Sequence, residues 1–151
     1  MVEALVGMSS SPAKDSFRLH HQLRVRWAEV DAQNIVFNAH YLAYFDIGIT
    51  EYWRAIGLPY PDSIAGSGGD LFVVKSLINY HAAARYDDWL DVCVRAAKAG
   101  NSSMTFAMAI FRGNECLVSG EIVYVFACPD ARKSQPLPAH LRDAVTAFEY
   151  S

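Results

Sequence analysis

The sequence predicts an α+β domain in which a five-stranded antiparallel sheet wraps around one long central helix, followed by a short C-terminal helix. An apolar segment of helical length covers residues 39–56, and it is preceded by one strand-like run and followed by four. A helix of that length spans about 27 Å, and strands of comparable length span about 33 to 40 Å. Because these lengths match, a sheet curled around the helix buries both elements most economically.

The first predicted strand covers residues 17–27, where apolar and polar side chains alternate. The odd positions run from Phe17 to Trp27 and are mostly apolar, whereas the even positions carry arginine, histidine and glutamine. A period of two predicts a strand with one buried face. Residues 29–37 follow as a loop.

The central helix is predicted over residues 39–56, with Asn38 as its N-cap and with Gly57 and Pro59 ending it. The segment is apolar on nearly all sides, which is typical of a buried helix. Gly48 in its middle costs about 1 kcal/mol relative to alanine. We therefore expect a neighbouring backbone to pack closely against that position.

Residues 57–70, "GLPYPDSIAGSGGD", are rich in proline, glycine and serine and are predicted to form a loop. The four strand-like runs that follow are joined by the short connections "ARYDD", "GN" and "GNE", which favour an antiparallel meander. "ACPDARKSQPLP" then ends the sheet, and Pro138 is placed to begin the last helix. The four runs cover residues 71–82, 89–99, 103–112 and 116–127.

The length of 151 residues fits one domain, predicted over residues 17–151 after a flexible tail over residues 1–16. With 52% hydrophobic and 19% charged residues, the composition is that of a compact globule. The net charge of -3 argues against a nucleic-acid partner. No apolar run approaches the roughly 20 residues needed to span a membrane, and the N-terminus is a poor signal peptide.

The cysteines and histidines lack the spacing of a metal site, so no metal is expected. An odd number of cysteines favours free thiols in a reducing cytoplasm, which is the expected location. The chain contains no phosphate-binding loop, no dinucleotide motif and no Gly-x-Ser-x-Gly elbow. The cysteines are Cys93, Cys116 and Cys128.

The stretch "RWAEVDAQNIVFNAHYLAYFD" (residues 26–46) places carboxylates directly before the apolar helix. Asp31 has two interpretations: it is an ordinary turn residue, or it faces a ligand bound at the first turn of the helix. That turn offers unpaired N–H groups and a partial positive charge, which suit an oxyanion. At Asn38, capping and such a backbone donor are compatible. Glu29 is interpreted as a solvent-facing charge.

The order of strand, long helix, four strands and short helix, with "VDAQNIVFNAHYLAYFD" at the helix entrance, resembles the hotdog fold. More narrowly, it resembles the 4-hydroxybenzoyl-CoA thioesterase family of acyl-CoA thioesterases. The resemblance covers residues 17–149, and its motif is Asp31, then "IVF" (residues 35–37), then Tyr41. Weaker similarity lies in "YHAAARYDDWLDV" (residues 80–92) and "GNSSMTF" (residues 100–106).

The resemblance implies hydrolysis of an acyl-CoA or aroyl-CoA thioester to the free acid and CoA. It assigns Asp31 as nucleophile or general base, without deciding between them, and the backbone N–H at Asn38 as the donor to the carbonyl. No cofactor is implied, because CoA is part of the substrate. Family active sites lie between subunits, so a homo-oligomer is expected. It is expected to be at least a dimer, and a tetramer is favoured over a dimer. Two departures are Asn34, often glycine in the family, and Asn38, which is histidine or tyrosine in some members.

Substrate-binding candidates fall into two groups. Phe37 and Tyr41 lie at the entrance of the helix, where the acyl group is expected. The phosphates of CoA require cationic or donor groups, and each candidate for that role is equally compatible with an ordinary solvated hairpin. These candidates are Lys98, Asn101, Ser102 and Ser103, with Arg85 and Lys75 behind them.

Three alternatives stay open at this level. Asp46 or Glu51 in the helix is a second possible catalytic carboxylate, although Asp46 is better interpreted as a subunit-interface or salt-bridge residue, since buried charges usually have partners. In a second alternative, the thioester substrate is carried by acyl carrier protein instead of CoA. In the third, the protein binds acyl-CoA without catalysis.

Overall fold

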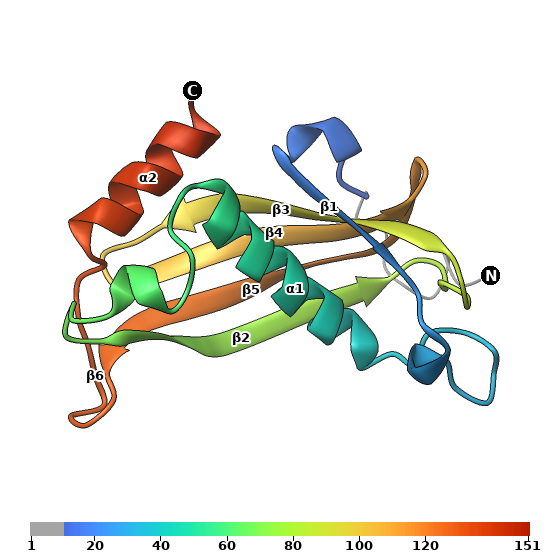
Figure 1. The fold of residues 1–151 in the computed structure, drawn as a ribbon, viewed down its shortest axis with the longest axis horizontal. Coiled ribbons are helices and arrows are strands. Elements are labelled where there is room, and N and C mark those ends of the chain that lie inside the picture. Colours follow the sequence, from blue (N-terminus) through green and yellow to red (C-terminus); the bar gives the residue numbers. More distant parts are fainter. Residues whose placement is uncertain (1–10) are drawn as a thin grey trace.

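A computed structural model of the chain describes residues 11–151. One curled antiparallel sheet with the order β1-β3-β4-β5-β2 forms the body of the domain, and helix α1 lies across one of its faces (Figure 1). The elements are β1 (Leu19–Arg24), α1 (His40–Ala55), β2 (Asp70–Tyr80), β3 (Trp89–Ala99), β4 (Ser103–Arg112), β5 (Glu115–Cys128), β6 (Lys133–Ser134) and α2 (Ala139–Glu149).

The predicted architecture is confirmed, with one addition to the sheet. The segment expected to end the sheet turns back, so that β6 pairs with the end of β5 through Ala127 and Cys128. Helix α2 begins directly after Pro138, as predicted. Within the described residues, no helix has both the length and the apolarity required to cross a membrane.

The first strand is shorter than predicted, since it covers Leu19–Arg24 rather than residues 17–27. After it the chain leaves the sheet, and Trp27 opens a short 3-10 turn, Trp27–Glu29. The predicted burial of Trp27 is wrong: its side chain is 70% exposed and packs edge-on against Tyr86, with ring centroids 5.2 Å apart. The alternation of polar and apolar residues therefore continued past the last strand residue.

Helix α1 buries one side against the sheet. Phe45 and Tyr52 are fully buried, and the ring of Tyr52 meets that of Phe106 on β4 at 5.2 Å between centroids. The opposite side is open in a single chain, where Leu42 is 41% and Ile47 40% exposed. The expectation of a helix buried all round is therefore wrong for one chain.

The close packing predicted at Gly48 is present, but its source differs. A Cβ atom added there lies 2.6 Å from Val92 Cγ1 and 3.0 Å from Val94 Cγ2. Both neighbours are side chains of β3, not backbone atoms. The glycine therefore lets α1 approach a ridge of valines on the sheet.

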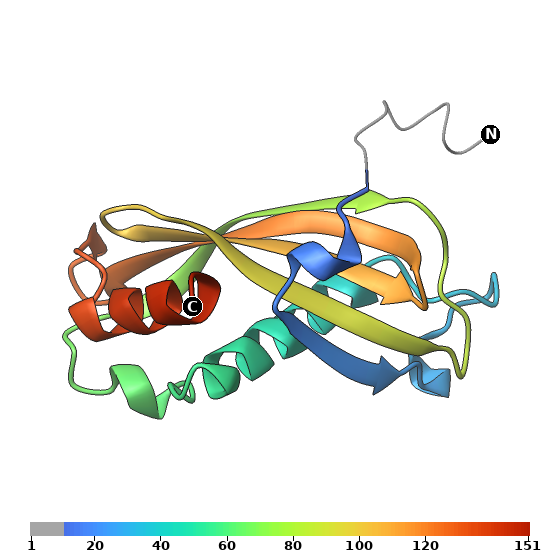
Figure 2. The same cartoon turned by 90° about the horizontal axis from the view of Figure 1, so that it is seen from above.

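The predicted tail over residues 1–16 falls largely on residues 1–10, which lie outside the described residues. The remainder packs on the sheet face opposite α1 (Figure 2). There Lys14–Ser16 form one helical turn, and Phe17 joins a second apolar cluster with Cys93, Ala109 and Phe111. The packed part of the chain thus begins before Phe17, the residue at which the domain was predicted to start.

Candidate active site

The loop before α1 is a tight turn organised by Asp31. Its backbone N–H donates to Ile35 O at 3.0 Å, and its carbonyl accepts the N–H of Asn34 at 3.0 Å. Its carboxylate atom Oδ1 accepts the N–H of Gln33 at 2.8 Å. Asn34 has φ 62, a left-handed conformation that asparagine adopts more readily than most residues. Asp31 is therefore a turn residue, yet Oδ2 accepts no hydrogen bond within residues 11–151.

Two backbone contacts fix this loop to the rest of the fold. Val30 and Val36 form an isolated antiparallel bridge at its base. Val36 also donates its N–H to Ala84 O at 2.9 Å, which ties the loop to the segment after β2. The turn at Asp31 is thus held at the entrance of α1.

A backbone donor is left free immediately before the first turn of α1. The N-cap is Ala39 rather than Asn38, and no side chain caps the helix, so the predicted capping role of the Asn38 side chain is wrong. The carbonyl of Asn38 accepts the N–H of Tyr41 at 3.4 Å, whereas its own N–H donates no hydrogen bond within the described part of the chain. A free N–H at the positive end of a helix suits an oxyanion.

Asp31, Asn38 and Tyr41 line one cavity of about 320 Å³ between the loop and the end of β2. Further lining comes from Tyr80, His81 and Ala83. The structure thus brings together the predicted carboxylate, the predicted backbone donor and one predicted substrate contact.

Two tyrosines organise the inner wall of this cavity. Tyr41 is buried, and its hydroxyl accepts the N–H of Ala84 at 3.0 Å; burial raises its pKa above the ordinary value of 10.0. Tyr80 donates its hydroxyl to Asn38 O at 3.2 Å, and its ring meets that of Tyr41 edge-on at 5.8 Å. Tyr80 and His81 were not assigned from the sequence. Their only signal was the similarity noted for "YHAAARYDDWLDV".

The other predicted binding residues lie elsewhere in a single chain. Phe37 is 45% exposed and packs against His40 outside the cavity. Lys98, Asn101, Ser102 and Ser103 lie at the opposite end of the sheet, where Leu137 N–H donates to Asn101 O at 2.8 Å. On β5 the partner of Ser103 is Val125 and the partner of Tyr80 is Val118, a separation of about 23 Å along the strand.

Comparison with known proteins decides the family. The family model described as "Thioesterase superfamily" matches residues 33–119. The chain belongs to the thioesterase superfamily. This match contains Asn38, Tyr41, the whole of α1 and β2, and most of the meander, and it confirms the resemblance inferred from the motif around Asp31.

Relatives of this thioesterase agree. It is 31% identical to "Acyl-CoA thioesterase YbgC" from Haemophilus influenzae over 129 residues. These residues cover 85% of this chain and 92% of the relative. The PA5185 protein from Pseudomonas aeruginosa superposes with a TM-score of 0.78 at 27% identity, covering 93% of this chain and 97% of that one. Slr0204 from Synechocystis is a 1,4-dihydroxy-2-naphthoyl-CoA thioesterase. It superposes with a TM-score of 0.80 at 19% identity, covering 87% of this chain and 98% of that one, which shows the shared hotdog fold.

Glu29 of the thioesterase is not the solvent-facing charge that its spacing suggested, since it is only 6% exposed. Burial alone raises the pKa of its carboxyl group. Hydrogen bonds from the Arg26 backbone N–H and the Tyr44 hydroxyl, with the Arg26 guanidinium, outweigh burial and lower the pKa below the ordinary 4.5. Glu29 is therefore a buried, ionised and fully bonded carboxylate.

This lowered pKa predicts the pH dependence of stability. A carboxyl whose pKa is lower in the folded state stabilises the fold above its unfolded pKa, about 4.3, and loses that contribution as pH falls through the folded value. We expect the difference in unfolding free energy between wild type and Glu29→Gln to be largest above about pH 5 and to shrink on acidification. Denaturant titrations at a series of pH values measure it; a difference that stays constant down to about pH 3 contradicts the assignment.

The helix carboxylates of the thioesterase are placed differently from expectation. Asp46 is exposed and forms no ion pair with any residue in 11–151, so no salt bridge holds it within one chain, and its interpretation as a subunit-interface residue stays a prediction. It lines a smaller cavity of about 240 Å³ with Tyr60 and Tyr124. Glu51 pairs with Arg54 on the helix surface. Neither carboxylate reaches the lining of the Asp31 cavity.

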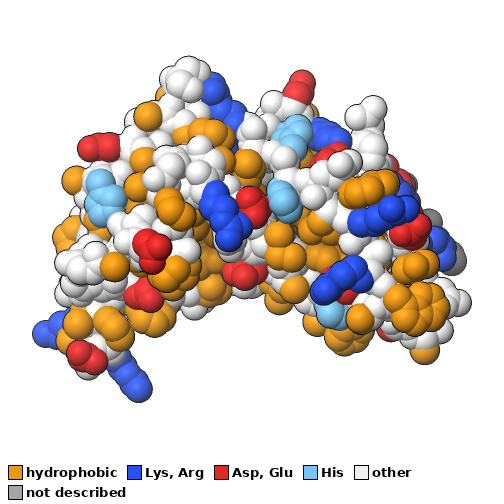
Figure 3. Space-filling model, viewed as in Figure 1, with side chains coloured by type: hydrophobic (Ala, Val, Ile, Leu, Met, Phe, Trp, Pro, Cys, Tyr) orange, Lys and Arg blue, Asp and Glu red, His pale blue; other side chains and the backbone are white. Residues whose placement is uncertain are grey.

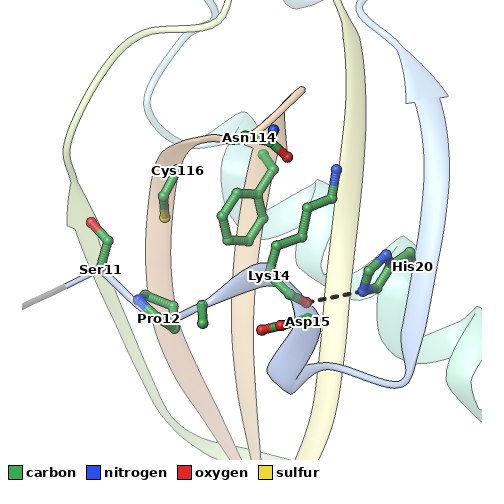
Figure 4. A pocket seen from close by; sticks show the side chains of 9 residues that line it. Ser11, Pro12, Lys14, Asp15, His20, Asn114 and Cys116 are labelled. Carbon is green, nitrogen blue, oxygen red and sulfur yellow. Dashed lines mark hydrogen bonds between the residues drawn. The ribbon is translucent and has the colours of Figure 1, made fainter.

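Another cavity, of about 510 Å³, opens on the sheet face opposite α1 (Figure 4). Its cation is already neutralised, because Lys14 Nζ lies 2.7 Å from Asp91 Oδ2 and donates to Gly113 O at 2.8 Å. His20 Nε2 bonds Lys14 O at 3.1 Å, so this nitrogen carries the hydrogen. Among residues 11–151, no three His, Cys, Asp or Glu side chains are grouped to hold a metal ion.

Proposed function

We propose that this thioesterase hydrolyses an acyl-CoA or aroyl-CoA to the free acid and CoA, with Asp31 and the backbone N–H of Asn38 acting on one thioester carbonyl. One observation carries the proposal: Asp31 Oδ2 and the Asn38 N–H, neither of which has a partner in the described residues, belong to groups lining the same cavity. Asn38 is exposed and Asp31 is partly exposed, so water can reach both groups. A thioester that enters the cavity can replace that water at both groups at once.

The chemistry of the two groups is complementary. An N–H at the start of α1 donates to the carbonyl oxygen and is strengthened by the helix dipole as negative charge develops there. Asp31 then acts in one of two ways. As a general base it takes a proton from water, whose oxygen attacks the carbonyl carbon as CoA thiolate leaves. As a nucleophile it attacks directly, expels the thiolate and forms a mixed anhydride that water later hydrolyses.

The carrier is proposed to be CoA. The Haemophilus relative is named an acyl-CoA thioesterase, and the Synechocystis neighbour acts on an aroyl-CoA by its name. The walls around the cavity, with Ile35, Val36 and Tyr41, are apolar, as an acyl or aryl group requires. An acyl carrier protein substrate is the alternative.

We propose further that two copies pair through β2. This strand ends the sheet order, so its outer edge is unpaired within the described residues. Apolar side chains gather along this edge (Figure 3), and a long apolar edge strand favours pairing with another chain. The exposed fractions are 42% for Phe72, 53% for Val73, 60% for Val74, 40% for Leu77 and 40% for Tyr80.

A two-fold axis at this edge pairs the β2 strands antiparallel. The Asp70 end of a second copy then lies beside the Tyr80 end of the first. Since the turn at residues 100–102 lies at the Asp70 end of its own sheet, the turn of the second copy comes to the same end as the Asp31 cavity. In such a dimer the predicted CoA-binding residues of one copy lie at the same end as Asp31 of the other, although the two are far apart within one chain.

The predicted role of Lys98 follows from this arrangement. We expect Lys98→Ala to raise KM for acyl-CoA about five- to tenfold while kcat changes little, because a phosphate contact is lost far from the carbonyl. Steady-state kinetics at two salt concentrations measure it, with Lys14→Ala, whose ammonium pairs with Asp91 at 2.7 Å on the sheet face opposite α1, as the control. An unchanged KM removes Lys98 from the CoA site.

A direct assay tests the function itself. Purified wild-type protein is supplied with a panel of short, long and aromatic acyl-CoA esters and with matching acyl carrier proteins, and thiol release is followed. Hydrolysis of at least one CoA ester in preference to its carrier-protein counterpart is expected. Preference for carrier protein favours the alternative substrate, and binding of CoA esters without hydrolysis of any of them supports a binding protein.

A further inference from the structure

Glu29 is one of only two buried polar or charged side chains in the described residues, the other being Ser119. An isolated buried carboxylate is costly unless each of its oxygens is hydrogen-bonded. Glu29 lies two residues before Asp31 and outside the lining of the Asp31 cavity. Its burial beside the site therefore needs an explanation that does not involve contact with substrate.

The hydrogen bonds of Glu29 are of two kinds: those with Arg26 close its own turn, whereas those from Tyr44 and Phe37 join this turn to the helix and to the far end of the Asp31 loop. Oε1 accepts the backbone N–H of Arg26 at 2.7 Å and the hydroxyl of Tyr44 at 2.8 Å. Oε2 accepts the guanidinium of Arg26 at 3.1 and 3.2 Å. The backbone carbonyl of Glu29 accepts the N–H of Phe37 at 2.9 Å, immediately before Asn38. One residue thus bonds both ends of the loop and, through its side chain, the helix.

Tyr44 is the link on the helix side. It lies one turn after His40, where α1 begins, and it is 1% exposed. Its ring also packs edge-on against Tyr41, a cavity wall residue, at 6.0 Å between centroids. The hydroxyl has no partner other than Glu29 among the described residues. Its orientation therefore depends on the carboxylate that the loop supplies.

We infer that Glu29 is a positioning residue that, through Tyr44, sets the distance between Asp31 and the free N–H at the start of α1. The inference rests on the proposed function, because it assigns no chemistry to Glu29 itself. Catalysis on one carbonyl requires the base and the oxyanion donor at a fixed separation, and a displacement of about 1 Å costs roughly 100-fold in rate. Among the described residues, the Glu29–Tyr44 bond is the side-chain hydrogen bond that joins the Asp31 loop directly to α1.

The test compares two conservative substitutions on one helix. Tyr44→Phe removes only the hydroxyl that bonds Glu29. Tyr52→Phe is the matched control, since Tyr52 is also fully buried on α1 and donates to a carboxylate, Glu149, at the same 2.8 Å, but two turns further from Asp31. Both variants lose one hydrogen bond from a buried tyrosine hydroxyl to a carboxylate, so similar decreases in melting temperature are expected.

Activity is expected to separate the two variants. Tyr44→Phe lowers kcat about 10- to 100-fold with less than a threefold change in KM, and Tyr52→Phe changes kcat less than threefold. In an Asp31→Asn background, Tyr44→Phe is expected to lower kcat no further, because it acts through Asp31. Equal kcat values for the two single variants overturn the inference, as does a full further loss in the double variant.

Amide hydrogen exchange tests the same inference without activity. We expect the N–H groups of Asn34 and Phe37 to exchange faster in Tyr44→Phe than in wild type, while Tyr52→Phe leaves them unchanged. Unchanged exchange in both variants overturns the positioning role even if Asp31 proves catalytic. If the wild type hydrolyses no thioester, the proposed function and the catalytic meaning of the inference both fail, and faster exchange then shows only a structural anchor.

Discussion

We expect Asp31→Asn to lower kcat for acyl-CoA hydrolysis by about 100- to 10,000-fold, the range found when a positioned general base or nucleophile is lost. The substitution keeps the loop intact, because an asparagine oxygen still accepts the N–H of Gln33 that Oδ1 accepts now. It removes the negative charge of the group that faces the cavity. Substrate binding is therefore expected to change much less than turnover. Initial-rate kinetics on the best substrate of the panel, with KM and kcat separated, measure the effect.

Asp46→Asn is the control for this prediction, because Asp46 is an exposed carboxylate of the same domain that lines a different cavity. Its kcat is expected to stay within about threefold of wild type, since surface substitutions away from a site have small effects. The reverse result, with Asp46→Asn inactive and Asp31→Asn active, transfers the catalytic role to the helix carboxylate. Full activity in both variants removes both carboxylates from the mechanism.

The largest expected effect on stability is that of Gly120→Ala. A Cβ atom at Gly120 lies 2.0 Å from Leu77 O and 3.0 Å from Leu77 C, and both atoms belong to the backbone of β2. A backbone cannot rotate away as a side chain does, so β2 and β5 must separate. We expect a loss of about 3 kcal/mol, or a melting temperature lower by roughly 10 °C, measured by thermal unfolding.

Gly100→Ala provides the matched control for Gly120→Ala. An added Cβ at Gly100 meets Ser103 Oγ at 2.8 Å, and the next nearest atom lies 3.6 Å away. Because a serine hydroxyl rotates freely, this variant is expected to lose less than about 1 kcal/mol. Equal losses in the two variants contradict the account of β2 packing. Since the outer edge of the displaced strand, β2, is proposed to pair two copies, weaker self-association of Gly120→Ala is expected as well.

The sequence was sufficient to predict the architecture, since helix and strands each carry their own periodicity. The alternation after residue 17 and the apolar segment at residues 39–56 led to the correct strand and helix order. The same patterns placed the end of β1 too late, because the polar alternation continues into the turn that starts at Trp27. Periodicity reports the face that a residue occupies and not where hydrogen bonding to the next strand ends.

The site was predicted as far as local sequence reaches. Asp31, Asn38 and Tyr41 lie within eleven residues, so one loop and one helix turn place them together. Tyr80 joins them only through the return of β2 to the helix start, which no local pattern contains. Glu29 was misassigned for a similar reason: its burial depends on Tyr44, fifteen residues away. Contacts between segments that are separate in the sequence decide these roles.

We propose that one thioester carbonyl is held between Asp31 and the backbone N–H of Asn38. A crystal structure with a non-hydrolysable CoA thioester analogue tests it most directly. We expect the carbonyl oxygen to lie within about 3 Å of the Asn38 nitrogen and the Asp31 carboxylate to face the carbonyl carbon. A carbonyl bound beside Asp46, or turned away from the first turn of α1, contradicts it.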